Sequence, residues 1–325
     1  MKGIRVLDRP ASQSFYAVAG RLLFVQSFDL ELATLIERLF AGWQLTPVSS
    51  PERNPDIKIT FTCGELPQVP AGLSEFEVAE GGRCYNAGDE YYLLFANSML
   101  HVADNKVAVD VSVFSKKMPS PSAAELARVT SFAVCAALRR FGLFEMHSAG
   151  VALPNTSDGV LIVGPSGSGK STLTLHLANA GWSYLSDDEL LLSLNDEGVE
   201  ARGFRSFFAL APGGLPNTKG ILKTRFEPAA VFSAPRVDRV RPRFLLFAAI
   251  GGANETQLHE LTQAETMSRL IRACPWATYD TAIAGPNLEL LSRLARQAKG
   301  FNLMAGTDLL EPDRASQIIG SVCRS

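Results

Sequence analysis

The chain has 325 residues, of which 46% are hydrophobic and 20% charged, and 31 Lys and Arg against 33 Asp and Glu give a net charge of −2. This composition excludes a disordered or fibrous chain and provides no global basic field for nucleic acid or an anionic membrane. The apolar runs are far shorter than the ~20 residues that span a bilayer, and the N-terminus lacks a signal-peptide core. We therefore expect a cytoplasmic protein with no membrane span and no nucleic-acid partner.

Residues 1–118 are predicted to form a separate α+β domain. Apolar residues at helical spacing predict a helix over residues 30–43, and a β-rich run predicts a strand at residues 57–61. Valines at alternating positions from 107 to 113 predict a further strand. An antiparallel sheet with one helix against it would account for this pattern. The domain is a candidate for recognition of a substrate or partner.

Residues 119–325 are predicted to form an α/β domain. Pro119-Ser-Pro121-Ser122 is typical of a linker, and Ser122 with Glu125 predicts a capping box that opens a helix reaching about Arg140. Strand and helix patterns alternate after it, with strands expected at residues 160–163, 184–194 and 244–250 and helices at 170–180, 263–273, 287–299 and 313–323. Such alternation predicts a layered α/β fold.

Residues 164–171 match the phosphate-binding loop pattern G-x-x-x-x-G-K-[ST], with an apolar strand before them and a helix pattern after them. In such a loop, backbone N–H groups and the helix N-terminus bind phosphates. Lys170 would reach the β and γ oxygens, and the Ser171 hydroxyl would ligate Mg²⁺. The predicted nucleotide-binding residues are Gly164, Ser166, Gly167, Ser168, Gly169, Lys170, Ser171 and Thr172.

Two adjacent carboxylates, Asp187 and Asp188, follow the next apolar segment. We expect that segment to be a strand beside the loop's own strand, which would bring both residues to the same crevice. Because neighbouring residues of a strand point to opposite sides, one carboxylate could accept a proton while the other holds Mg²⁺. The ordinary alternative for such a pair is a solvated acidic turn.

The order of three segments, His147-Ser-Ala-Gly150, the loop at 164–171 and Leu185-Ser-Asp187-Asp188, resembles the catalytic domain of HPr kinase/phosphorylase and related HPr-kinase-like serine kinases. The resemblance covers roughly residues 140–275 and is strongest over 144–192. It implies a P-loop domain that uses ATP and Mg²⁺ to phosphorylate a serine of a protein or peptide. It also implies that Asp187 is the base and that His147 supports it, which leaves Asp188, together with Ser171 of the loop, for the metal site.

The family's later signature, Glu-x-Arg-Gly-Leu-Gly, is not matched, because the similar residues 200–204 come too early and lack the second glycine. The identity of the acceptor and a reverse or pyrophosphate-dependent reaction therefore stay open, as does a homo-oligomeric state. Two alternatives also stay open: a nucleotide-sensing regulator without an acceptor, and a small-molecule kinase.

A segment rich in glycine, proline and cations follows at residues 211–225. Its composition suits a loop that closes over triphosphate and substrate. Arg202 and Arg205 are further candidate cations for the same site.

Overall fold

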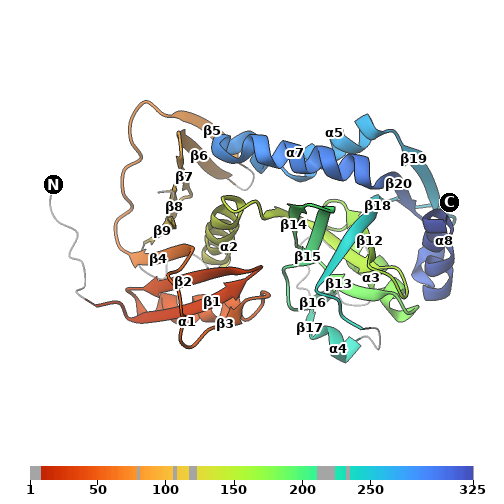
Figure 1. The fold of residues 1–325 in the computed structure, drawn as a ribbon, viewed down its shortest axis with the longest axis horizontal. Coiled ribbons are helices and arrows are strands. Elements are labelled where there is room, and N and C mark those ends of the chain that lie inside the picture. The colour runs from red at the N-terminus through yellow and green to blue at the C-terminus, as the bar shows by residue number, and fades with distance from the viewer. Residues whose placement is uncertain are drawn as a thin grey trace. The chain divides into compact units, whose positions relative to one another are not determined.

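A computed structural model describes residues 9–78, 81–104, 108–116, 123–210, 224–231 and 235–324. The chain divides into two compact units (Figure 1): the first comprises residues 1–143 and 276–285, and the second comprises residues 144–275 and 286–325. Helix α2 (Ala123–Arg139) packs on strands β8 (Ser98–Asp104) and β9 (Val109–Ser115) in the first unit. The division therefore lies further along the chain than the boundary expected at residue 118, and the linker expected at 119–122 lies outside the described residues.

The first unit is built on a nine-stranded sheet in the order β3-β1-β2-β4-β9-β8-β7-β6-β5. Strand β4 (Ile57–Cys63) pairs in parallel with both of its neighbours, and the remaining pairs are antiparallel. Helix α1 (Leu30–Phe40) connects β2 to the strands beyond it, which allows the parallel pairing. The sheet is therefore mixed rather than antiparallel as expected, and α2 belongs to this unit in addition to α1. The other strands are β1 (Ser12–Val18), β2 (Arg21–Ser27), β3 (Thr46–Pro47), β5 (Ser74–Val78), β6 (Gly82–Ala87) and β7 (Glu90–Leu94).

A short segment at residues 276–285 returns to the first unit and is held there by buried polar contacts. Arg140 Nη1 donates a hydrogen bond to Asp280 Oδ2 at 2.7 Å, and both side chains are buried. Asn86 Nδ2 donates to the carbonyl oxygen of Tyr279 at 2.6 Å. These contacts join parts of the chain that are far apart in sequence into one packing unit.

The second unit is built on a sheet in the order β10-β14-β15-β18-β12-β11-β13, with β20 beside β18 and β19 beside β20. Strand β18 (Arg239–Ile250) pairs in parallel with β12 (Asp158–Val163) and β20 (Lys299–Ala305). Strand β11 (Ser148–Ala152) is antiparallel to both β12 and β13 (Ser183–Ser186). The other strands are β10 (Phe144–Met146), β14 (Leu190–Asn195), β15 (Gly198–Gly203), β16 (Phe208–Leu210), β17 (Thr224–Phe226) and β19 (Gln257–Leu261). This mixed α/β architecture agrees with the layered fold expected for this region.

Helices α3 (Lys170–Asn179) and α8 (Pro312–Arg324) pack against each other and share a core with the sheet. That core contains buried Leu173 and Leu177 of α3 and Ile319 of α8, together with apolar residues of β11, β12, β18 and β20. Helix α7 (Thr281–Gln297) begins before the expected start at 287 and contains Pro286. The other helical segments are α4 (Pro228–Val231), α5 (Gln263–Ala273), α6 (Trp276–Tyr279) and η3 (Thr307–Leu310).

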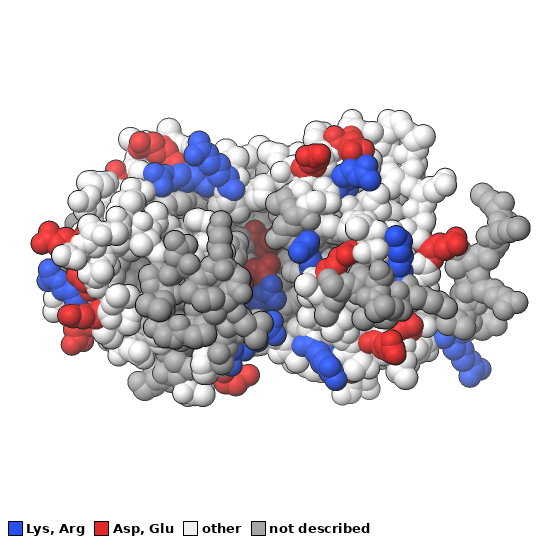
Figure 2. Space-filling view, turned by 180° about the vertical axis from the view of Figure 1, so that it is seen from behind, with Lys and Arg blue, Asp and Glu red and all other residues white. Residues whose placement is uncertain are grey.

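The surface charge is mixed in sign. On the face shown in Figure 2, acidic and basic side chains lie in small interspersed groups. Among the described helices, none combines the length and apolar character required to cross a bilayer.

Candidate functional site

The predicted phosphate loop connects the end of β12 to the start of α3, which is the strand-loop-helix context that the motif requires. Gly167 and Gly169 have φ values of +84° and +89°, in the left-handed region that favours glycine. A Cβ on Gly164 would lie 2.5 Å from Ser168 Oγ and 2.7 Å from the carbonyl oxygen of Ala248. The path of this loop therefore depends on glycine at three of its positions.

Within the described residues, no side chain caps the N-terminus of α3. Its N-cap is Gly169, and its first turn contains no acidic residue. The first N–H groups of a helix lack acceptors within the helix and carry a partial positive charge. A helix start of this kind, directly after a glycine-rich loop, is suited to bind phosphate oxygens.

Lys170, the first residue of α3, is buried, and its polar contacts include two loop carbonyls and a histidine. Its Nζ donates to the carbonyl oxygens of Gly164 at 2.7 Å and Pro165 at 3.1 Å, and lies 3.1 Å from Nε2 of His147. Because an ammonium group can only donate, Nε2 is the acceptor in this contact, which assigns the imidazole proton to Nδ1. The lysine is thus held over its own loop and against His147.

His147 lies at the junction between β10 and β11. Its Nδ1 lies 3.4 Å from Oδ1 of Asp188, and both side chains are partly exposed. His147 therefore contacts Lys170 through one ring nitrogen and approaches Asp188 through the other. The structure places the predicted histidine, the predicted lysine and one of the two predicted carboxylates next to one another.

Asp187 and Asp188 occupy the turn between β13 and β14, so the strand expected over residues 184–194 is two strands with the acidic pair between them. The Asp187 side chain is 1% exposed, and its Oδ2 accepts a hydrogen bond from the backbone N–H of Ala209 at 2.9 Å. The Asp188 side chain is 43% exposed. The two carboxylates thus have different surroundings, as the prediction of two different roles requires.

The carboxylate pair reaches the loop by a different topology from the one expected. Strand β13 does not lie beside β12, because β11 lies between them. Since β11 is antiparallel to both, β12 and β13 run in the same direction and their C-terminal ends lie at the same edge of the sheet. The expectation of neighbouring strands is therefore wrong, whereas the shared edge is present.

The two candidate arginines are engaged with carboxylates. Arg205 Nη2 lies 2.7 Å from Oε2 of Glu189, and Arg202 Nη2 lies 2.6 Å from Oε1 of Glu200. Residues 211–223 of the segment expected to close over the site lie outside the described residues. Of its cations, only Arg225 is described, and its guanidinium lies 4.3 Å above the ring of Phe207.

The oxygen donors at this edge fit a magnesium ion that is held jointly with phosphates. Within the described parts of the chain, no group of three or more His, Cys, Asp or Glu side chains could hold a metal ion. Mg²⁺ usually needs only one or two protein oxygens, because phosphates and waters complete its octahedral shell. The Asp188 carboxylate and the Ser171 hydroxyl are hard oxygen donors of this type.

Burial alters the acidity of a tyrosine next to the acidic pair. Burial and the negative charges of Asp187 and Asp188 raise the pKa of the Tyr184 hydroxyl well above its usual value. The hydroxyl therefore stays protonated throughout the physiological pH range, so Tyr184 can donate a hydrogen bond but supplies no negative charge.

Among the comparisons with known proteins, only the solved structures show similarity. No family model and no curated protein matches the chain. Among solved structures, the HPr(Ser) kinase/phosphatase from Coxiella burnetii is similar, with 12% sequence identity and a TM-score of 0.31. The similarity covers 55% of this chain and 97% of that one. At this level of similarity, the functional argument depends on the residues of the site itself.

Proposed function

We propose that the chain is a kinase that transfers the γ-phosphoryl group of ATP, with Mg²⁺, to a serine hydroxyl of a protein or peptide. The observation that carries the proposal is the contact of Lys170 with His147 and of His147 with Asp188, directly beside a glycine-dependent loop and an uncapped helix start. Phosphoryl transfer needs positioning, charge neutralisation and a base, and little covalent help from the protein. These residues are suited to all three tasks.

The loop residues have the role of binding the triphosphate in this proposal. The N–H groups at the start of α3 and the side chain of Lys170 hold the phosphate oxygens, and Lys170 exchanges its contacts with the Gly164 and Pro165 carbonyls for phosphate contacts. Asp188 and Ser171 hold Mg²⁺, which supplies charge neutralisation for the transferring group when it is bound. His147 orients Asp188 and limits the freedom of Lys170.

Asp187 is the proposed base that accepts the proton of the serine hydroxyl. Its position at the end of β13 and the hydrogen bond from Ala209 fix the carboxylate in one orientation. Because Asp187 is 1% exposed, an acceptor can reach its side chain only after the surrounding chain has moved. Asp188 is the second candidate for the base, since it is already exposed and next to His147. Separate replacement of the two carboxylates distinguishes the two assignments.

The experiment that tests the function is a search for the phosphorylated product. Lysate of the source organism is incubated with purified protein and γ-labelled ATP, in parallel with the Lys170→Ala variant. New phosphoserine that depends on Lys170 supports the proposal. Label that enters only small molecules would support a small-molecule kinase instead, and ATP binding without any labelled product would support a nucleotide-sensing regulator.

A further inference from the structure

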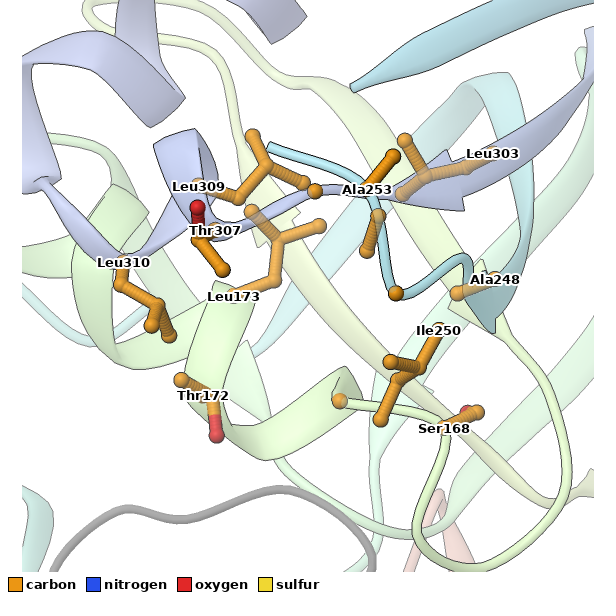
Figure 3. A pocket seen from close by; sticks show the side chains of 14 residues that line it. Ser168, Thr172, Leu173, Ala248, Ile250, Ala253, Leu303, Thr307, Leu309 and Leu310 are labelled. Atoms are coloured by element: carbon orange, nitrogen blue, oxygen red, sulfur yellow. The ribbon is translucent and has the colours of Figure 1, made fainter. Parts of the chain in front are cut away.

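A cavity of about 90 Å³ lies beside the first turn of α3 (Figure 3). Three segments form it: Ser168, Gly169 and the start of α3; the end of β18 and the residues after it; and the end of β20 with η3. All three belong to the second unit. The cavity therefore shares two residues, Ser168 and Gly169, with the predicted phosphate loop.

The walls of the cavity are almost entirely apolar. Leu173, Ala248, Ile250, Leu303, Leu309 and Leu310 supply most of its side chains. Among the described residues that line it, the side-chain polar groups are the hydroxyls of Ser168, Thr172 and Thr307, and none of these residues is charged or carries an amide side chain. Two of the lining side chains, Ile250 and Leu310, are exposed to solvent. Such walls suit a flat, carbon-rich ring rather than an ion.

Hydrogen bonds between the two loops on the far side of the cavity fix its shape. Thr256 N–H and Oγ1 both donate to the carboxylate of Asp308, at 3.0 and 2.5 Å, and Thr307 N–H donates to the carbonyl oxygen of Ala253 at 3.1 Å. The loop after β18 is thereby joined to the loop after β20. A wall that is already ordered loses little entropy when a ligand binds.

The order of the strands indicates in which direction a bound triphosphate would extend along the edge of the sheet. Strands β12, β18 and β20 run parallel, so the loops after them lie at one edge of the sheet, and β13 ends at that edge on the opposite side of β12. A triphosphate whose γ-phosphate faces Asp187 and Asp188 extends along the loop toward β18 and β20. The group attached to its α-phosphate then arrives at the cavity.

We infer that the cavity takes the purine base of the nucleoside triphosphate, an inference that rests on the proposed function. The base packs between Leu173 of α3, Ile250 of β18 and Leu310 of η3. Because the side chains that line the cavity offer hydroxyls alone to the base edge, binding depends on apolar contact and not on the pattern of donors and acceptors. The site therefore accepts adenine and guanine nucleotides with similar affinity.

Isothermal titration calorimetry on the full chain tests this inference with MgATP, MgGTP and magnesium tripolyphosphate, which has the phosphates alone. The variants are Leu310→Asn and Ile250→Asn, and the control is Leu288→Asn, a comparably exposed leucine on α7 away from the cavity. We expect the wild type to bind both nucleotides within about tenfold of each other and at least about tenfold more tightly than tripolyphosphate. Each cavity variant should weaken both nucleotides about threefold to tenfold and leave tripolyphosphate unchanged, and the control should change nothing.

The possible failures are distinguishable. Two results would contradict binding of the base in the cavity without affecting the proposed phosphate site. One is tripolyphosphate that binds as tightly as ATP, and the other is a pair of cavity variants that melt like the wild type and bind nucleotides normally. A preference of more than about a hundredfold for one purine would also overturn the inference, since hydroxyls alone supply too few hydrogen bonds for that discrimination. Absence of binding by all three ligands would refute the proposed function and this inference together.

Discussion

Lys170 Nζ and His147 Nε2 lie 3.1 Å apart, although the two residues are separated by a complete hairpin and a loop. The contact joins the lysine of a phosphate-binding loop to a histidine that also approaches Asp188. With the Lys170 ammonium as the donor, Nε2 of His147 is the acceptor, and the other ring nitrogen faces the carboxylate. A change at Lys170 is therefore expected to affect the position of Asp188 as well as phosphate binding.

Replacement of Lys170 by alanine should weaken binding of MgATP about tenfold to a hundredfold, because one charge-assisted set of hydrogen bonds to phosphate is lost. Calorimetry measures this directly. Lys299→Ala removes an exposed lysine from the start of β20 and serves as the matched control. If the folded Lys170→Ala variant bound MgATP as tightly as the wild type, Lys170 would have no role in phosphate binding.

Replacement of Asp188 by asparagine should raise the Mg²⁺ concentration needed for half-maximal ATP binding about tenfold, because the amide keeps one oxygen but loses the negative charge. ATP affinity is measured over a series of Mg²⁺ concentrations. Asp196→Asn, an exposed residue of the turn between β14 and β15, is the control. A magnesium dependence identical to that of the wild type would remove Asp188 from the metal site.

Replacement of Gly164 by alanine should lower the free energy of unfolding by about 1–3 kcal/mol and weaken ATP binding, since the new methyl group overlaps Ser168 Oγ and the Ala248 carbonyl. Gly64→Ala is the control, because a Cβ there meets nothing within 4 Å. Chemical denaturation followed by calorimetry checks both effects. If the two variants were equally stable, the close packing of the loop against β18 would be incorrect.

Replacement of Asp280 by alanine should destabilise the protein by about 3–5 kcal/mol, because it leaves the buried Arg140 guanidinium without its carboxylate. Glu289→Ala breaks an exposed pair with Arg293 and should cost less than about 1 kcal/mol. Denaturant unfolding measures the two differences. A cost for Asp280→Ala as small as that for the control would contradict the attachment of residues 276–285 to the first unit.

The local parts of the site could be predicted from the sequence. The strand, loop and helix at residues 158–179 lie where the contiguous motif placed them, and α5 covers the residues 263–273 that were expected to be helical. Such features depend on neighbouring residues alone, so periodicity and capping patterns are sufficient to find them.

The long-range pairings could not be predicted. Hydrophobic periodicity does not tell whether two strands pair in parallel or in which order they lie, so neither the mixed sheet of the first unit nor the position of β11 between β12 and β13 was visible. The approach of His147 to Asp188 depends on the pairing of β10 with β14, in which Met146 lies opposite Leu190. Two further features also depend on segments that are distant in sequence: the hydrogen bond from Ala209 to Asp187, and the apolar cavity. No sequence motif indicates either of them.

The most direct test of the kinase proposal is the rate of phosphoryl transfer by Asp187→Asn on the acceptor identified from lysate. Asparagine keeps the shape of the side chain but cannot accept the proton, so we expect nearly normal MgATP affinity and a rate about 10²–10⁴-fold lower than that of the wild type. Addition of His147→Ala should reduce the rate little further, because residues of one catalytic unit are not additive. Retention of more than about a tenth of the wild-type rate by Asp187→Asn would contradict the account and assign the base to another residue.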